Sequence, residues 1–193
     1  MRRGLFVGIT VLLVAAWSAT GLGAQATSTA GTAQEIGPFT YYNFINSDGT
    51  SVTGMAQRLG PFTYYNLQGS DGTSTSGNSQ QLGPFTHYNF QSSGAEVGRL
   101  KSSSTTGTSQ RLGPFTHYNF TTNGTEAGRL DSRTTTGTSQ ELGPFTYFDF
   151  QSSDGSSTSG SVWEMGTTSF WDLDTTDPVE VDSDPFGSIW DDD

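Results

Sequence analysis

Apolar and polar residues alternate within short aromatic segments that recur along most of the chain. The segment at residues 112–120 reads Leu-Gly-Pro-Phe-Thr-His-Tyr-Asn-Phe, and successive copies begin 23, 23, 30 and 30 residues apart. Self-similarity at such a spacing indicates an internal structural repeat. The five copies occupy residues 36–44, 59–67, 82–90, 112–120 and 142–150.

Each copy predicts one β-strand, because its aromatic and β-branched residues favour a pleated, half-buried environment. Alternation places Thr116, Tyr118 and Phe120 on one face and Phe115 and His117 on the other. We expect the first face to form the core, since every copy keeps a ring there, followed by Phe or Leu. The expected core pairs are Tyr42 and Phe44, Tyr65 and Leu67, Tyr88 and Phe90, Tyr118 and Phe120, and Phe148 and Phe150.

The opposite face of each strand carries a Phe, then a Tyr or His, then an Asn or Asp. Amphipathic rings of this kind lie at wetter surfaces, so we take this face as the candidate ligand-contact surface. Its residues are Phe39, Tyr41, Asn43, Phe62, Tyr64, Asn66, Phe85, His87, Asn89, Phe115, His117, Asn119, Phe145, Tyr147 and Asp149.

Polar turns are predicted after each aromatic strand, because Asp-Gly and Asn-Gly pairs supply the positive φ angles of tight hairpins. A hydroxyl-rich strand then returns, and a Gly-Pro turn opens the next copy, so one repeat reads strand, turn, strand, turn. Insertions in the longer third and fourth repeats, at residues 95–100 and 125–130, are expected to lengthen a hairpin or add a rung. The expected turns lie at residues 46–49, 70–72, 93–94, 122–125 and 153–155.

These patterns predict an all-β fold of tandem β-hairpin repeats, five copies with degenerate caps, that form an elongated antiparallel sheet. A parallel β-solenoid is the alternative arrangement. The caps would be residues 31–35, which match residues 137–141, and residues 160–166, which match residues 137–143 with Trp in place of Gln. Atypical terminal repeats cap such arrays, and we expect the array to end near Trp171.

The N-terminus has a basic start at Arg2 and Arg3, an apolar run from Leu5 to Trp17, and a small-residue region ending at Ala26. This order is typical of a secretory signal peptide. The apolar run is shorter than the about 20 residues that cross a bilayer, so no stable membrane span is expected after cleavage. The predicted protein is secreted or held at the cell surface, with the periplasm as the alternative location.

Three regions follow from these signals. Residues 1–26 are the predicted signal peptide, residues 27–171 the β-repeat array, and residues 172–193 an acidic tail expected to be disordered.

The net charge of −11 belongs mainly to the C-terminal end, since residues 161–193 hold ten acidic side chains and no basic one. Nucleic-acid binding requires clustered Lys and Arg, and the chain has no such patch, so nucleic acid is excluded as a partner.

A Ser-apolar-Trp-acid motif recurs in this last region, around Trp163, Trp171 and Trp190. We interpret it as either a short adhesive motif or a set of edge strands that pack Trp on the array.

Catalytic chemistry has few candidates in this sequence. The only histidines, His87 and His117, occupy equivalent positions of adjacent copies where the other copies have Tyr, which favours surface rings over metal ligands. The chain has no cysteine, so disulfides and thiolate zinc sites are excluded. It also lacks the G-x-S-x-G signature of serine hydrolases. We therefore expect a non-enzymatic protein with no cofactor and no bound metal.

The leading functional hypothesis is an exported structural or adhesive protein of the cell surface or extracellular matrix, because many weak, equal sites become strong through avidity. The runner-up is a carbohydrate-binding repeat module, in which exposed rings stack on sugars and Asn side chains hydrogen-bond to them. A third hypothesis is a self-assembling fibre subunit, since an open array has unpaired strand edges. The expected partners are glycans, matrix components or further copies of the chain.

Overall fold

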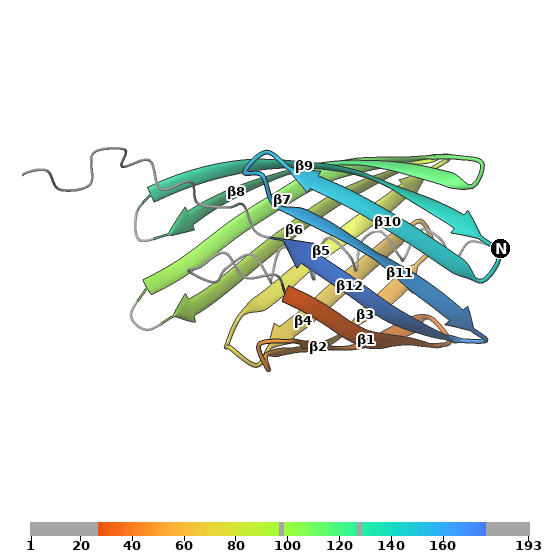
Figure 1. The fold of residues 1–193 in the computed structure, drawn as a ribbon, viewed down its shortest axis with the longest axis horizontal. Helices are drawn as coiled ribbons and strands as arrows, with labels where there is room; N and C mark the ends of the chain where they lie inside the picture. Colours follow the sequence, from red (N-terminus) through yellow and green to blue (C-terminus); the bar gives the residue numbers. More distant parts are fainter. Residues whose placement is uncertain (1–26, 97–98, 127–128, 177–193) are drawn as a thin grey trace, which may run out of the picture.

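The computed structural model describes residues 27–96, 99–126 and 129–176, which form a closed antiparallel β-barrel (Figure 1). The order of strands around the barrel follows their order in the chain. The strands are β1 (Thr27–Ile36), β2 (Phe39–Asn46), β3 (Ser51–Leu59), β4 (Phe62–Gly69), β5 (Ser74–Leu82), β6 (Phe85–Glu96), β7 (Arg99–Leu112), β8 (Phe115–Glu126), β9 (Arg129–Leu142), β10 (Phe145–Ser152), β11 (Ser157–Met165) and β12 (Thr168–Thr176).

The first and last strands close the barrel. β1 and β12 pair antiparallel, from Thr27 opposite Thr175 to Gln34 opposite Thr168. The predicted elongated sheet is therefore wrong, and the antiparallel pairing throughout also excludes the parallel solenoid. The elements expected to be caps are instead a full first strand and the start of a sixth hairpin, and β12 continues past Trp171 to Thr176.

Closure has a physical consequence for the strand edges. Each strand of the barrel has a hydrogen-bonded neighbour on both sides. An open sheet exposes two rows of unpaired backbone groups, whereas a closed barrel has no such edges. Fibre growth by edge pairing, which the third hypothesis requires, therefore has no strand to start from in the described barrel.

A two-residue turn joins the strands of each hairpin at one end of the barrel. In the first hairpin, Gly37 has a φ angle of 63° and Ile36 lies opposite Phe39. A positive φ at the first turn position, followed by the fixed negative φ of Pro38, matches a type II′ turn, whose twist suits a β-hairpin. The predicted Gly-Pro turn is confirmed, and in the sixth hairpin Gly166 precedes a threonine instead.

The insertions in the third and fourth repeats lengthen hairpins at the opposite end of the barrel (Figure 1). β6 and β7 pair as far as Glu96 opposite Arg99, and β8 and β9 pair as far as Glu126 opposite Arg129. The turns predicted at residues 93–94 and 122–125 are wrong, because those residues lie within β6 and β8. The added residue pairs extend both strands before the chain reverses.

The inner wall of the barrel is built from the predicted core face. Tyr118 and Phe120 are 4% and 1% exposed, and the equivalent residues of the other copies are also buried. A glycine on the neighbouring strand lies beneath these rings. Gly107 pairs with Tyr88 on one side and Phe120 on the other, and the two ring centroids are 5.3 Å apart.

Glycine is required at this position because no side chain fits. A Cβ atom added to Gly107 would lie 2.6 Å from the carbonyl oxygen of Asn119 and would collide with the ring of Phe120. The same conflict arises on each of the other hydroxyl-rich strands. The six glycines are Gly31, Gly54, Gly77, Gly107, Gly137 and Gly160. They allow a belt of aromatic and leucine side chains to continue around the inner wall.

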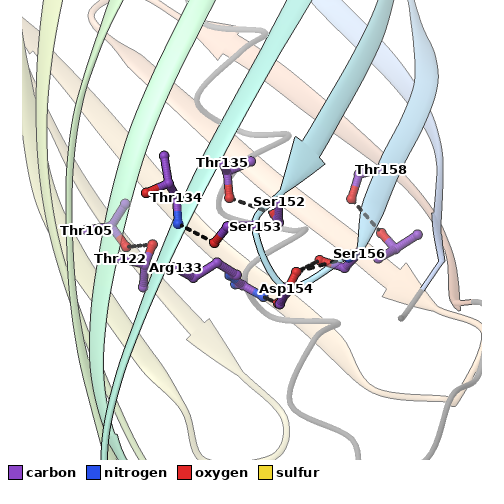
Figure 2. Close-up of polar contacts among 11 residues, drawn as sticks. Thr105, Thr122, Arg133, Thr134, Thr135, Ser152, Ser153, Asp154, Ser156 and Thr158 are labelled. Atoms are coloured by element: carbon purple, nitrogen blue, oxygen red, sulfur yellow. Dashed lines mark hydrogen bonds and ion pairs between the residues drawn. The ribbon is translucent and has the colours of Figure 1, made fainter. Parts of the chain in front are cut away.

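Hydroxyl groups line the inner wall on both sides of this belt. Tyr88 Oη and Ser109 Oγ are 2.8 Å apart. Toward the polar turns, Thr105 and Thr122 hydroxyls are 2.9 Å apart (Figure 2). Such bonds satisfy polar groups that are costly to bury alone. The hydroxyl-rich strands can therefore face the interior as well as solvent.

Candidate functional site

The candidate contact face predicted from the sequence lies on the outer wall of the barrel. Tyr64 and Tyr147 are each 48% exposed, as expected for rings that point away from the core. Phe39 and Phe62 are half-buried. The exposed members are Tyr41, Asn43, Tyr64, Asn66, Phe85, His87, Asn89, Phe115, His117, Asn119, Phe145, Tyr147 and Asp149. That these residues contact a ligand stays a prediction.

One part of the outer wall gathers four rings on the adjacent strands β10, β11 and β12. We call Phe145, Tyr147, Trp163 and Phe170 the outer aromatic row. The ring centroids of Phe145 and Trp163 are 6.5 Å apart with planes 19° apart, and those of Trp163 and Phe170 are 5.5 Å apart at 29°. Tyr147 stacks beside Phe145 at 6.4 Å. The register produces the row, because Trp163 lies opposite both Phe145 and Phe170.

Trp163 distinguishes this region from the rest of the outer wall. Gln110, the equivalent residue of an earlier copy, lies between Phe85 and His117, so an amide separates the two rings there. The Trp-for-Gln exchange is visible in the sequence. The sequence alone does not show that Trp163 completes a row of rings, because only the strand register places Phe145 and Phe170 on either side of it. Phe170 was therefore absent from the residues predicted to contact a ligand.

Carboxylates and hydroxyls lie beside the outer aromatic row. Ser161, two residues before Trp163 on β11, lies opposite Asp172, and Ser159 lies between Asp149 and Asp174. The three aspartates are exposed. From residue 142 to residue 176 the sequence contains no Lys or Arg. The rings are therefore flanked by negative charge that their own three strands do not neutralise.

The predicted Ser-apolar-Trp-acid motif is not one structural unit. Trp163 points outward and is 42% exposed, whereas Trp171 points inward and is 4% exposed. Trp171 packs between Phe44 and Phe148 of the inner wall, at 5.9 and 6.0 Å. Neither tryptophan lies in an edge strand, since β11 and β12 both have two neighbours. Trp190 lies outside the described residues.

The two histidines lie on the outer wall of different strands. His87 lies opposite Thr108 of β7, whereas His117 lies opposite Gln110 of the same strand. The strand β7 therefore separates the two histidines, and their partner residues on it are two positions apart. Among the residues that the structure describes, no group of three or more His, Cys, Asp or Glu side chains is placed to hold a metal ion.

A second feature of the outer surface is a groove of about 460 Å³ near the lengthened hairpins. One of its rows runs from Ser76 through Gln91 and Ser104 to Asn123. Its lining consists of hydroxyls, amides and glycine: Ser74, Ser76, Gln91, Ser92, Ser93, Ser102, Ser103, Ser104, Asn123, Gly124 and Thr125. The groove offers hydrogen bonds but neither a charge nor a ring on which a ligand could stack.

Aspartates also shape the polar turns at one end of the barrel, and Figure 2 shows Asp154 in one of them. Asp154 accepts hydrogen bonds from the backbone N–H and the hydroxyl of Ser156, at 3.0 and 2.7 Å, and pairs with Arg133 at 3.0 Å. Burial disfavours the charged carboxylate, but these bonds outweigh it and lower the pKa of Asp154. Asp48 and Asp71 accept the same pair of bonds in their own turns. These carboxylates stabilise turns.

Comparison with protein-family models and with curated proteins finds no match to this chain. Within the described ranges, the chain has no helix that is long and apolar enough to cross a membrane.

Proposed function

We propose that the protein is an exported, non-catalytic adhesive protein that binds carbohydrate through the outer aromatic row. The proposal depends on one observation, the stacked arrangement of Phe145, Trp163 and Phe170 across three adjacent strands. Phe145 and Trp163 keep 40% and 42% of their surface exposed. Contiguous exposed apolar surface marks interaction sites.

Carbohydrate fits the chemistry of this surface better than a purely apolar partner does. A pyranose ring has a face of C–H groups, which packs flat against an aromatic ring, and an edge of hydroxyls that need hydrogen-bond partners. The outer aromatic row supplies the first requirement. Ser161 and Asp172, in the adjacent outward positions, supply the second.

The closed barrel changes how adhesion would work. The outer faces of the hairpins point in different directions around the barrel (Figure 1). A flat partner surface can therefore contact only a few neighbouring hairpins at one time, and this limits avidity within a single molecule. The proposal consequently places binding in one region rather than equally in every repeat.

The substitution Trp163→Gln tests the proposal. Gln is the residue of the other copies at this position, so the change keeps a sequence that folds elsewhere in the barrel while it removes the central ring. We expect the wild-type chain to be retained on a panel of insoluble polysaccharides such as cellulose and chitin. Trp163→Gln should weaken retention about fivefold to tenfold, because a ring contact contributes about 1 kcal/mol.

Trp171→Phe is the matched control, since it alters a tryptophan of the inner wall where the fifth copy has Phe148. This variant should keep its polysaccharide retention. Circular dichroism confirms that both variants fold. Equal retention of Trp163→Gln and the wild type, or no retention of the wild type by any polysaccharide of the panel, would contradict the proposal.

A further inference from the structure

We infer that the outer aromatic row selects a cationic glycan, namely a polymer of amino sugars whose amines are free and protonated. The inference rests on the proposed function and adds the charge of the ligand to it. It follows from the side chains that surround the rings rather than from the rings themselves.

Among the described residues of β10, β11 and β12, the charges next to the outer aromatic row all have one sign. Asp172 lies two residues beyond Phe170 along β12, and Asp149 lies two residues beyond Tyr147 along β10. Two residues of a strand span about 7 Å, so a sugar ring stacked on either aromatic ring brings its substituents within reach of a carboxylate. Opposite charge at such a surface attracts a ligand, and like charge repels it.

These carboxylates are available for a ligand, unlike others on the barrel. Within the described residues, the side chains of Asp149, Asp172 and Asp174 form no hydrogen bond or ion pair. By contrast, Glu141 pairs with Arg111 at 2.7 Å, and Asp154 pairs with Arg133 at 3.0 Å. The aspartates beside the rings have no comparable function within the fold.

The rings favour the same ligand charge. An aromatic face carries negative potential and attracts a cation within about 6 Å of its centroid. A protonated amine on a stacked sugar is therefore attracted by the ring and by the neighbouring carboxylate together. A uronic acid in the same position is repelled by both, and an acetylated amine gains neither attraction.

The repeat supplies a conservative way to remove the charge. The equivalents of Asp149 and Asp172 in the other copies are Asn43, Asn66, Asn89 and Asn119. The double variant Asp149→Asn/Asp172→Asn therefore restores the common residue at both positions. Asp48→Asn/Asp71→Asn is the matched control, because it removes two carboxylates from turns outside the row and an Asn oxygen can still accept their hydrogen bonds.

The experiment compares three oligosaccharides of equal length by titration calorimetry with the full chain, at a pH where amines are protonated. We expect a glucosamine oligomer to bind at least about tenfold more tightly than its N-acetylated form, and an oligogalacturonate to bind least. Removal of each carboxylate should narrow the ratio of the two affinities about twofold to threefold, and added salt should narrow it further. The control variant should keep the preference.

The outcomes separate this inference from the proposed function. Equal affinity for the free and acetylated oligomers overturns the inference, while the proposed carbohydrate binding stands. Absence of binding to all three oligosaccharides contradicts both. Competition by an oligolysine that binds as tightly as the glucosamine oligomer also overturns the inference, because the surface would then recognise positive charge without a sugar.

Discussion

The two walls of the barrel are built from the same strands but vary to different extents. On the inner wall, a phenylalanine or leucine side chain lies over a glycine in each hairpin, as Phe120 lies over Gly107. On the outer wall, the residue between two rings is Gln110 in one hairpin and Trp163 in another. Packing restricts the inner positions to glycine and to aromatic or leucine side chains, whereas exposure to solvent allows the outer position to change from an amide to an indole. The repeats therefore produce the fold, and the differences between them produce the proposed binding surface.

Alkaline pH should affect the inner wall most strongly. Burial raises the pKa of Tyr65, Tyr88 and Tyr118, and hydrogen bonds to serine hydroxyls reverse the shift only in part. Such groups stabilise the fold fully below the unfolded pKa of about 10, and this stability is lost as pH rises above it. We expect denaturant unfolding to show that the free energy of unfolding falls by about 1.4 kcal/mol per pH unit above this pKa for each buried tyrosine.

Tyr88→Phe provides the control for this prediction, since Phe148 occupies the equivalent position of the fifth copy. The variant should lose stability less steeply above pH 10. The prediction would be contradicted if phenolate absorbance showed that all tyrosines ionise while the barrel is still folded.

The strand glycines should be sensitive single positions of the inner wall. Gly107→Ala places a methyl group against the Phe120 ring and the Asn119 carbonyl oxygen, and overpacking of this kind costs about 1–3 kcal/mol. Gly124→Ala is the matched control, because the nearest atoms to its added Cβ lie 3.7 Å away. Thermal melts should show a clear loss for the first variant and little change for the second. Similar melting temperatures would contradict the packing argument.

A transplanted tryptophan should extend the binding surface to another hairpin. Gln110→Trp puts an indole between Phe85 and His117, in the arrangement that Trp163 has between Phe145 and Phe170. We expect a gain of severalfold in polysaccharide retention with little change in stability. In the Trp163→Gln background, the same change should recover part of the lost retention. No gain in either background would show that more than the stacked rings is needed.

Much of the wall could be predicted from the sequence, but its closure could not. Alternation correctly assigned Tyr118 and Phe120 to the core and Phe115 to the surface, because each strand buries one face. Local patterns are the same in an open and a closed sheet, so they contain no signal for the pairing of β1 with β12. The recurring glycines, Gly31 and Gly160 included, were the clue that the terminal segments are complete repeats. The outer aromatic row required the register between strands.

Acid should reveal a smaller effect at the polar turns. The lowered pKa of Asp154 means that its contribution is present above the usual Asp value and is lost as pH falls through the lowered one. The side chain is 37% exposed, so we expect well under about 1 kcal/mol. The free energy of unfolding should therefore fall slightly less between pH 5 and pH 2 in Asp154→Asn than in the wild type. An unchanged difference would contradict the assignment.

The indole N–H signals of Trp163 and Trp171 provide the most direct test, because the two tryptophans sample the outer and inner walls of adjacent strands. Nuclear magnetic resonance of the labelled chain, titrated with a glucosamine oligomer, reports on both in one spectrum, and the spectrum of Trp163→Gln assigns the first signal. The account predicts that the Trp163 signal shifts with oligosaccharide concentration while the Trp171 signal stays in place. An unmoved Trp163 signal at saturating oligosaccharide would contradict it.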